Sequence, residues 1–395
     1  MTTPTTPAPS ARRARGAVSA LFLTNGAIYA NLIPRLPEIK DALGLSDTVY
    51  GLSIAAMPAG ALLSGLAAAT LIRRVGSGRL AVLGSVLLAV AMLAAGLAPL
   101  PVLFALALFV VGMLDSVTDV AQNTHGLRVQ RRYGRSIINS FHAVWSLGAV
   151  MGGLMSAAAI ALRLPLGVHL AITGAIFAAT ALVALRFCLP GPDGDALEDG
   201  SPPAVVLRSR PSPRVALTLA GLALVAIAGT TVEDVGSSWA TLYMGESLGA
   251  PAPLAAMGFI ALIGSQFVGR IVGDRLVDRL GQRTVAVAGG ALVVAGMGLA
   301  LAFPSIPGTL AGFAAAGFGV ATLVPAAMQV ADELPGLRAG TGLTIVTWLM
   351  RLGFLLSPLV IGTVSDATEL RVSLLVVPLS GVFVIALSGV LRRRG

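Results

Sequence analysis

The sequence predicts an all-α membrane protein with twelve transmembrane helices in two pseudo-symmetric six-helix bundles. Its composition, its recurring apolar stretches and an internal repeat support this fold class. Of the 395 residues, 56% are hydrophobic and only 11% are charged, whereas soluble domains contain about 25% charged residues. So few charges cannot cover the surface of a soluble chain of this size. The composition therefore excludes soluble enzymes, DNA-binding modules and secreted disulfide scaffolds, and the single cysteine excludes an internal disulfide.

Apolar stretches long enough to cross about 30 Å of hydrocarbon recur along the chain. We expect twelve spans, at about residues 17–37, 48–72, 80–99, 101–127, 136–162, 165–188, 215–244, 252–277, 282–303, 306–333, 339–365 and 370–391. The longest break is rich in proline, glycine and charged residues, which predicts a linker between two bundles. The expected organisation is a disordered cytoplasmic tail, an N-terminal bundle, a cytoplasmic linker, a C-terminal bundle and a second tail, at residues 1–16, 17–188, 189–214, 215–391 and 392–395.

The distribution of arginine predicts the orientation. Arginines gather before span 1, in alternate connections after it, and at the end of the chain, whereas the other connections carry few basic residues. Since basic loops stay in the cytoplasm, both termini are expected to be cytoplasmic. The net charge of +9 then reflects membrane orientation, and nucleic acid is not an expected partner. The abundance of arginine, alanine and glycine indicates a GC-rich bacterial genome, hence a multi-pass protein of the bacterial cytoplasmic (inner) membrane.

The two halves of the chain repeat at a fixed offset of 205 residues. The repeated positions are Gly16/Gly221, Gly44/Gly249, Gly76/Gly281, Pro99/Pro304, Gly112/Gly317 and Gly148/Gly353. Each pair falls on equivalent spans, which predicts a duplication with both halves in parallel orientation.

The loop after span 8, Asp278-Arg279-Leu280-Gly281-Gln282-Arg283, resembles the D-R-x-G-x-R/K loop of the major facilitator superfamily. Within that superfamily the chain is most similar to the fucose permease-like branch, through its span 1 exit and polar residues of spans 4 and 5, namely Pro34-Arg35-Leu36-Pro37-Glu38, Leu43-Gly44-Leu45-Ser46, Asp119, Asn123 and His142. The resemblance implies the major facilitator fold and transport by alternating access. Span 1 lacks the acid that sugar permeases of the branch carry there.

Ionisable residues inside spans are costly and mark candidate functional sites. Asp115, Asp119 and Asn123 share one face of span 4 because they are four residues apart. Asp119 lies at about the same depth as His142 on the neighbouring span. We expect a protonatable Asp119–His142 pair, with Asp115 as a further proton-coupling residue. A structural polar clamp between the two helices is the alternative.

Spans 7 and 11 carry further charges. Glu233 lies near the outer end of span 7 and is expected to be a proton-coupling group or a solvated vestibule acid, whereas Asp234 is expected to be solvated in the vestibule. Arg351 lies about 18 Å from the cytoplasmic end of span 11 at a rise of about 1.5 Å per residue. A buried arginine requires a partner, so we expect either an ion pair with Glu233, which we favour, or an anionic substrate.

The remaining polar and aromatic residues inside the spans complete the predicted sites. The expected substrate-binding residues are Asn25, Tyr29, Asn31, Gln122, Asn123, Trp239, Trp348 and Arg351. A cytoplasmic gate is expected from Arg270, Asp274, Asp278 and Arg279. The three histidines are dispersed and there is no phosphate-binding loop, so no metal, cofactor or enzymatic activity is expected.

The predicted function is secondary active transport of a small polar solute, coupled to protons, by a monomer in the lipid bilayer. A proton-driven exporter of drugs or amphipathic metabolites is the first alternative, and it would need a cavity rich in aromatic residues, which make up only 5% of this chain. A non-transporting membrane receptor or scaffold is the second, and it would lack buried charges.

Overall fold

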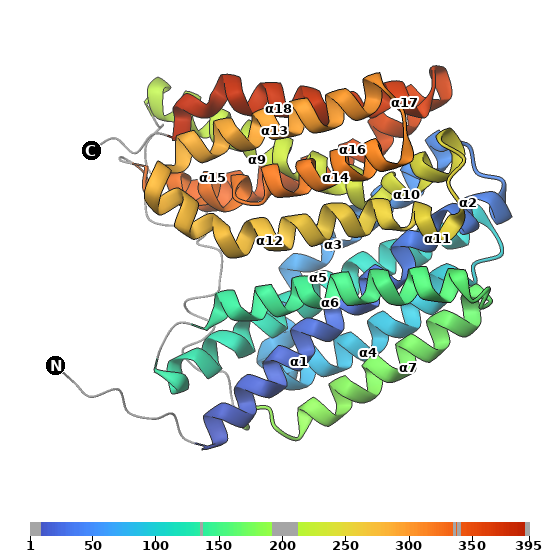
Figure 1. The fold of residues 1–395 in the computed structure, drawn as a ribbon. Coiled ribbons are helices and arrows are strands. Elements are labelled where there is room, and N and C mark those ends of the chain that lie inside the picture. The colour runs from blue at the N-terminus through green and yellow to red at the C-terminus, as the bar shows by residue number, and fades with distance from the viewer. Residues whose placement is uncertain (1–8, 135–136, 192–211, 335–336, 338–340, 392–395) are drawn as a thin grey trace. The chain divides into compact units, whose positions relative to one another are not determined.

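A computed structural model describes residues 9–134, 137–191, 212–334, 337 and 341–391 (Figure 1). All regular elements within these ranges are helices. Twelve helical stretches in the described ranges are long and apolar enough to cross a membrane. The predicted fold class, an all-helical protein with twelve spans, is therefore confirmed.

The chain divides into two compact units. The first unit contains residues 1–32 and 56–201, and the second contains residues 33–55 and 202–395. The sequence predicted a division at the linker alone. It did not anticipate that residues 33–55, which connect the first two spans, pack with the C-terminal helices.

The first unit is built from six long helices. They are α1 (Pro9–Leu32), the later part of α3 (Asp47–Val75), α4 (Ser77–Gly96), α5 (Pro101–Tyr133), α6 (Ile138–Ala161) and α7 (Leu166–Leu185). Helix α1 begins eight residues earlier than the predicted span 1, so residues 9–16 of the expected tail are helical. Proline suits the first turn of a helix because its missing N–H has no partner there. The added turns are held by Arg15, whose Nη1 donates to the Tyr133 hydroxyl at 3.0 Å.

The second unit contains the start of α3 and the C-terminal helices. Its elements are η1 (Ile33–Arg35), α2 (Leu36–Leu43), α9 (Pro213–Ser238), α10 (Ala240–Leu242), η2 (Tyr243–Ser247), α11 (Ala252–Ala255), α12 (Met257–Leu280), α13 (Gln282–Ala302), α14 (Ile306–Val320), α15 (Leu323–Asp332), α16 (Thr341–Ala367), α17 (Leu370–Ser373), α18 (Val376–Leu387) and η3 (Ser388–Leu391).

The sequence repeat is reproduced in three dimensions within each unit. A Cβ atom at Gly112 would lie 1.8 Å from the Met57 carbonyl oxygen, and one at Gly317 would lie 2.1 Å from the Leu262 carbonyl oxygen. Met57 and Leu262 are themselves separated by the repeat offset of 205 residues. The same backbone-to-backbone approach, which only glycine permits, therefore occurs at equivalent places in both units.

Candidate functional site

In the first unit, polar side chains of three helices meet around Asn25 of α1. Its Nδ2 donates to Asp115 Oδ1 of α5 at 2.9 Å, and its Oδ1 accepts from Trp145 Nε1 of α6 at 2.7 Å. The neighbouring Gly26 lets α1 approach α6 closely, because a Cβ there would lie 2.3 Å from the Trp145 carbonyl oxygen. The structure thus connects two predicted site residues, Asn25 and Asp115, through an amide that uses both its donor and its acceptor. Sequence reasoning missed Trp145.

The predicted proton-coupling residues Asp119 and His142 are both exposed in the structure. Asp119 Oδ1 accepts from Asn123 Nδ2 on the same helix at 2.9 Å. The His142 ring lies edge-on to Phe22 of α1, with the ring centroids 5.3 Å apart. Asp119 thus contacts Asn123 and His142 contacts Phe22, and a functional Asp119–His142 pair stays a prediction.

Two predicted substrate-binding amides hold helices of the first unit together. Asn31 is buried, and its Nδ2 donates to the Ala27 carbonyl oxygen at 2.8 Å while its Oδ1 contacts His169 Nε2 of α7 at 2.8 Å. Gln122 is also buried, and its Nε2 donates to the Leu21 carbonyl oxygen at 3.2 Å. These hydrogen bonds satisfy buried amides that would otherwise be costly, and a substrate-binding role for Asn31 and Gln122 stays a prediction.

In the second unit, Glu233 of α9 contacts α12. Its Oε2 accepts from Gln266 Nε2 at 2.9 Å and lies 3.6 Å from Arg270 Nη2. Gly236, three residues on, faces the same helix, since a Cβ there would lie 2.1 Å from Leu262. The favoured Glu233–Arg351 pair is not formed, because the side of α9 that carries Glu233 faces α12 and not α16. Arg270, predicted to be a gate residue, belongs to this polar network.

Arg351 lies in α16 and is partly exposed. In the part of the chain that the structure describes, its guanidinium makes no hydrogen bond and no ion pair. Arg351 is seven residues from Pro358 and therefore shares a side of α16 with it. A permanent charge of this kind within a membrane span requires water or an anionic partner.

Asp234 differs from the sequence expectation of a solvated vestibule acid. It is only 8% exposed. Its Oδ1 accepts from Ser238 Oγ at 3.5 Å, and its Oδ2 is buried with no hydrogen-bond partner among the described residues. The expectation was wrong because the start of α3, which sequence patterns did not place here, packs over the C-terminal end of α9.

The remaining predicted residues have separate surroundings. Trp239 is fully buried and contacts Tyr50 of α3 edge-on at 5.0 Å, whereas Trp348 is 58% exposed and Tyr29 is partly exposed. The other three predicted gate residues, Asp274, Asp278 and Arg279, are exposed at the end of α12. Their side chains make no hydrogen bond or ion pair with any residue in the described ranges.

Sequence reasoning also missed a charged cluster at the start of α3. Lys40 Nζ lies 3.1 Å from Asp47 Oδ1 and 2.8 Å from Glu246 Oε1. The Asp366 carboxylate of α16 accepts from the backbone N–H groups of Asp47 and Thr48 at 2.9 and 2.8 Å. Ser46-Asp47 is a local helix-start signal, but no local pattern could identify a capping residue more than 300 positions away.

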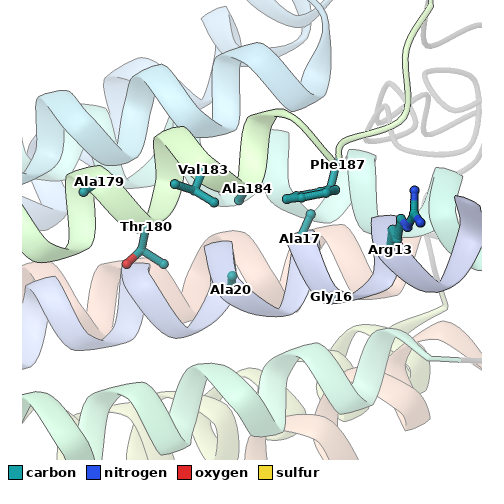
Figure 2. Close-up of a pocket in the computed structure, with 9 residues that line it drawn as sticks. All are labelled: Arg13, Gly16, Ala17, Ala20, Ala179, Thr180, Val183, Ala184 and Phe187. Atoms are coloured by element: carbon teal, nitrogen blue, oxygen red, sulfur yellow. The ribbon is translucent and has the colours of Figure 1, made fainter.

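A cavity of about 550 Å³ lies between α1 and α7 in the first unit (Figure 2). Small and apolar side chains line it, and Figure 2 shows Arg13 at one end and Thr180 as its other polar residue. None of the predicted site residues contributes to it. The cavity is therefore separate from the polar clusters described above.

The Major Facilitator Superfamily model matches residues 18–276 and 265–395. The chain belongs to the Major Facilitator Superfamily. Among the relatives of this superfamily member, the uncharacterized transporter y4wD of Sinorhizobium fredii is 29% identical over 376 residues, covering 95% of this chain and 97% of the relative. The membrane protein MosC of Rhizobium meliloti is 27% identical over 368 residues, covering 93% and 88%.

Solved structures share the same fold. The nucleoside transporter NupG superposes with a TM-score of 0.71 at 12% identity, covering 96% of this chain and 99% of that one. A bacterial homologue of the human lysosomal transporter Spinster, inward-facing and occupied, has a TM-score of 0.75 at 16% identity, covering 97% and 96%. This superfamily member is thus a multi-pass membrane transporter of small molecules and not an enzyme.

Proposed function

We propose that this transporter moves a small polar solute across the bacterial cytoplasmic membrane by alternating access, coupled to protons. Its termini are cytoplasmic, it acts as a monomer, and it falls in the fucose permease-like branch. The observation that carries the proposal is the set of ionisable side chains inside the spans of both units. Such residues are costly in a membrane and mark substrate and proton pathways.

Arg351, which has no partner among the described residues, supports an anionic substrate. The sequence left open whether Arg351 pairs with Glu233 or with the substrate. Glu233 instead contacts Gln266 and Arg270, and no described residue uses the donors of the Arg351 guanidinium, which can therefore bind a carboxylate or phosphate. A planar guanidinium binds such groups through two parallel hydrogen bonds. Organic acids are therefore the leading substrate class.

The first unit carries its own polar groups, which we propose bind solute and protons. The Asn25–Asp115–Trp145 cluster offers a carboxylate beside an amide and an indole. Asp115, Asp119 and His142 are the proposed proton-coupling residues of this unit. Asn25, Tyr29 and Asn123 are the proposed substrate contacts. Asn25 donates to Asp115 and Asn123 donates to Asp119, and Tyr29 lies four residues after Asn25 on the same face of α1.

Uptake into proteoliposomes tests this function. Purified full-length protein is reconstituted, and accumulation of labelled sugars, organic acids and amino acids is measured with and without a pH gradient. We expect organic acids to accumulate, by about tenfold for each proton and each pH unit of gradient, since one pH unit corresponds to about 1.4 kcal/mol.

The role of Arg351 is tested with Arg351→Gln and a matched control, Arg275→Gln, which removes an exposed arginine of α12. Arg351→Gln should raise the substrate KM by at least about tenfold, because a hydrogen bond to a charged group contributes about 1.5–3 kcal/mol. Arg275→Gln should leave KM unchanged. Equal effects of the two substitutions, or accumulation of neutral sugars alone, would refute the anionic-substrate proposal.

A further inference from the structure

Two buried oxygen atoms in the second unit lack hydrogen-bond partners and lie next to each other. Asp234 Oδ2 of α9 is one, and Ser357 Oγ of α16 is the other, within the described part of the chain. The Ser357 hydroxyl lies close enough to the Asp234 carboxylate to interact with it, although the two groups do not form a hydrogen bond of normal geometry. A hydroxyl can donate to an ionised carboxylate or accept from a protonated carboxyl group. Burying the ionised form without a cationic partner is costly, and this cost favours the protonated form.

The packing of α9 against α16 explains why these residues meet. Gly353 lies against Thr230, since a Cβ at Gly353 would be 3.1 Å from the Thr230 hydroxyl. Asp234 and Ser357 each follow four residues later on their helices. Residues four apart lie on one helical face, so Asp234 and Ser357 form the next layer of the same interface.

The first unit has no such pair at the equivalent positions. The repeat offset of 205 residues relates Asp234 to Tyr29 and Ser357 to Gly152. A Cβ at Gly152 would lie 2.4 Å from the Ala27 carbonyl oxygen, so the first unit uses this position for close helix packing. The second unit has instead a hydroxyl that faces an acid. The pair is thus a specific feature of the second unit and not a consequence of the duplicated fold.

No described cation is positioned to neutralise Asp234. Its neighbour Glu233 is also an acid and is held by Gln266 and Arg270 of α12. The ionisable residue of α16 closest in sequence to Ser357 is Arg351, nearly two helical turns away. From α3, the nearest titratable group is the phenol of Tyr50, which is neutral at physiological pH.

Tyr50 covers this site at the outer end of α9. Its hydroxyl donates to the Ser238 carbonyl oxygen at 2.6 Å, one turn beyond Asp234. The adjacent Gly51 packs on α16, since a Cβ there would lie 2.2 Å from the Pro358 carbonyl oxygen. The start of α3 therefore contacts residues that closely follow both Asp234 and Ser357, and it separates the carboxyl group from the outer end of the unit.

We propose that Asp234 is a proton-binding site of the second unit, occupied in the present conformation and opened to the outside when the Tyr50–Ser238 contact breaks. The site rests on the proposed proton coupling and locates one coupling proton. On binding, the carboxylate takes up one proton at Oδ2 and becomes neutral, with Ser357 Oγ as the acceptor of its hydrogen bond. On opening, the same proton is released to water and the negative carboxylate is solvated.

Infrared spectroscopy of the purified full-length protein tests this assignment without any substrate. Protonated carboxyl groups have a C=O band distinct from that of carboxylates, and the band shifts in D₂O. At neutral pH the wild type should show this band. Asp234→Asn should lose the contribution of one carboxyl group. Asp274→Asn, a matched control at an exposed acid of α12, should retain the full band.

Two further variants keep the proposal testable if Asp234→Asn does not fold. Ser357→Ala should shift the position of the band without removing it, because the acceptor hydroxyl is lost. Tyr50→Phe keeps the ring against Trp239 and deletes one hydrogen bond. It should accelerate hydrogen–deuterium exchange of the band about fivefold, as expected for one neutral hydrogen bond.

Several outcomes would overturn the proposal. The full band in Asp234→Asn would show that Asp234 is not protonated. An unchanged band position in Ser357→Ala would refute Ser357 as the acceptor of its hydrogen bond. Loss of the band on replacing choline chloride with sodium chloride would indicate a sodium site instead. Failure of all solutes in the uptake panel would refute the proposed transport function but leave this result intact. Conversely, proton-driven uptake without the Asp234 band would refute only this site.

Discussion

The N-terminus of α3 should depend on a carboxylate from a distant helix. Asp366 of α16 accepts hydrogen bonds from the Asp47 and Thr48 backbone N–H groups at 2.9 and 2.8 Å. These N–H groups have no partner within their own helix, so Asp366→Ala leaves two donors uncapped. Loss of a cap costs about 0.5–2 kcal/mol, and loss of a negative charge beside a helix N-terminus costs about 0.3–1 kcal/mol at an exposed site.

The combined cost of about 1.5 kcal/mol corresponds to about a tenfold change in an equilibrium constant. The equilibrium in question is detachment of residues 33–55 from the C-terminal helices. A cysteine at residue 53 reports on it, because Ser53 is only 2% exposed in the attached state. In a Cys188→Ser background with Ser53→Cys, Asp366→Ala should accelerate labelling by a membrane-impermeant maleimide about tenfold.

Two controls decide whether capping is the cause. Asp366→Asn retains one acceptor oxygen and should give an intermediate rate. Glu369→Ala removes an exposed acid near the same end of α16 and should leave the rate unchanged. Equal acceleration by Glu369→Ala and Asp366→Ala would refute the capping argument and attribute the effect to net charge. An unchanged rate in Asp366→Ala would show that the two hydrogen bonds do not hold α3 in place.

The packing and the burial lead to three further expected results. Burial raises the pKa of the Cys188 thiol to about 11 from 9.0, so at pH 8 its alkylation should be about 100-fold slower than that of an unperturbed thiol and should rise with pH towards 11 as thiolate forms. Gly317→Ala should destabilise the protein by about 1–3 kcal/mol, because the new methyl group meets the backbone of α12, whereas Gly298→Ala, with open space around it, should not lower the Tm. In a double-mutant cycle with stability as the readout, the destabilising effects of Glu233→Gln and Arg351→Gln should be additive within about 0.5 kcal/mol. Strong coupling between the two substitutions would contradict the structure and indicate that Glu233 and Arg351 form an ion pair.

The spans and the repeat could be predicted from the sequence because both depend on local or regularly spaced information. Whether a segment of about 20 residues enters a membrane depends on its own apolar content. The paired glycines likewise mark positions where a side chain would clash or where the backbone adopts a conformation that favours glycine. Gly112 and Gly317 meet a backbone carbonyl in both units, and Gly44 and Gly249 have positive φ angles of 59° and 64°.

The surroundings of the charged residues were decided only by the tertiary structure. Glu233 and Asp234 are neighbours in the sequence, yet one faces α12 and the other faces α16. Successive residues of an α-helix point about 100° apart, with 3.6 residues per turn. Which helix a side chain meets therefore depends on the rotation and neighbours of its own helix, and composition does not contain that information. The partners of Asp366 and the cover over Asp234 come from the start of α3, a segment distant in sequence that joins the second unit through tertiary packing alone.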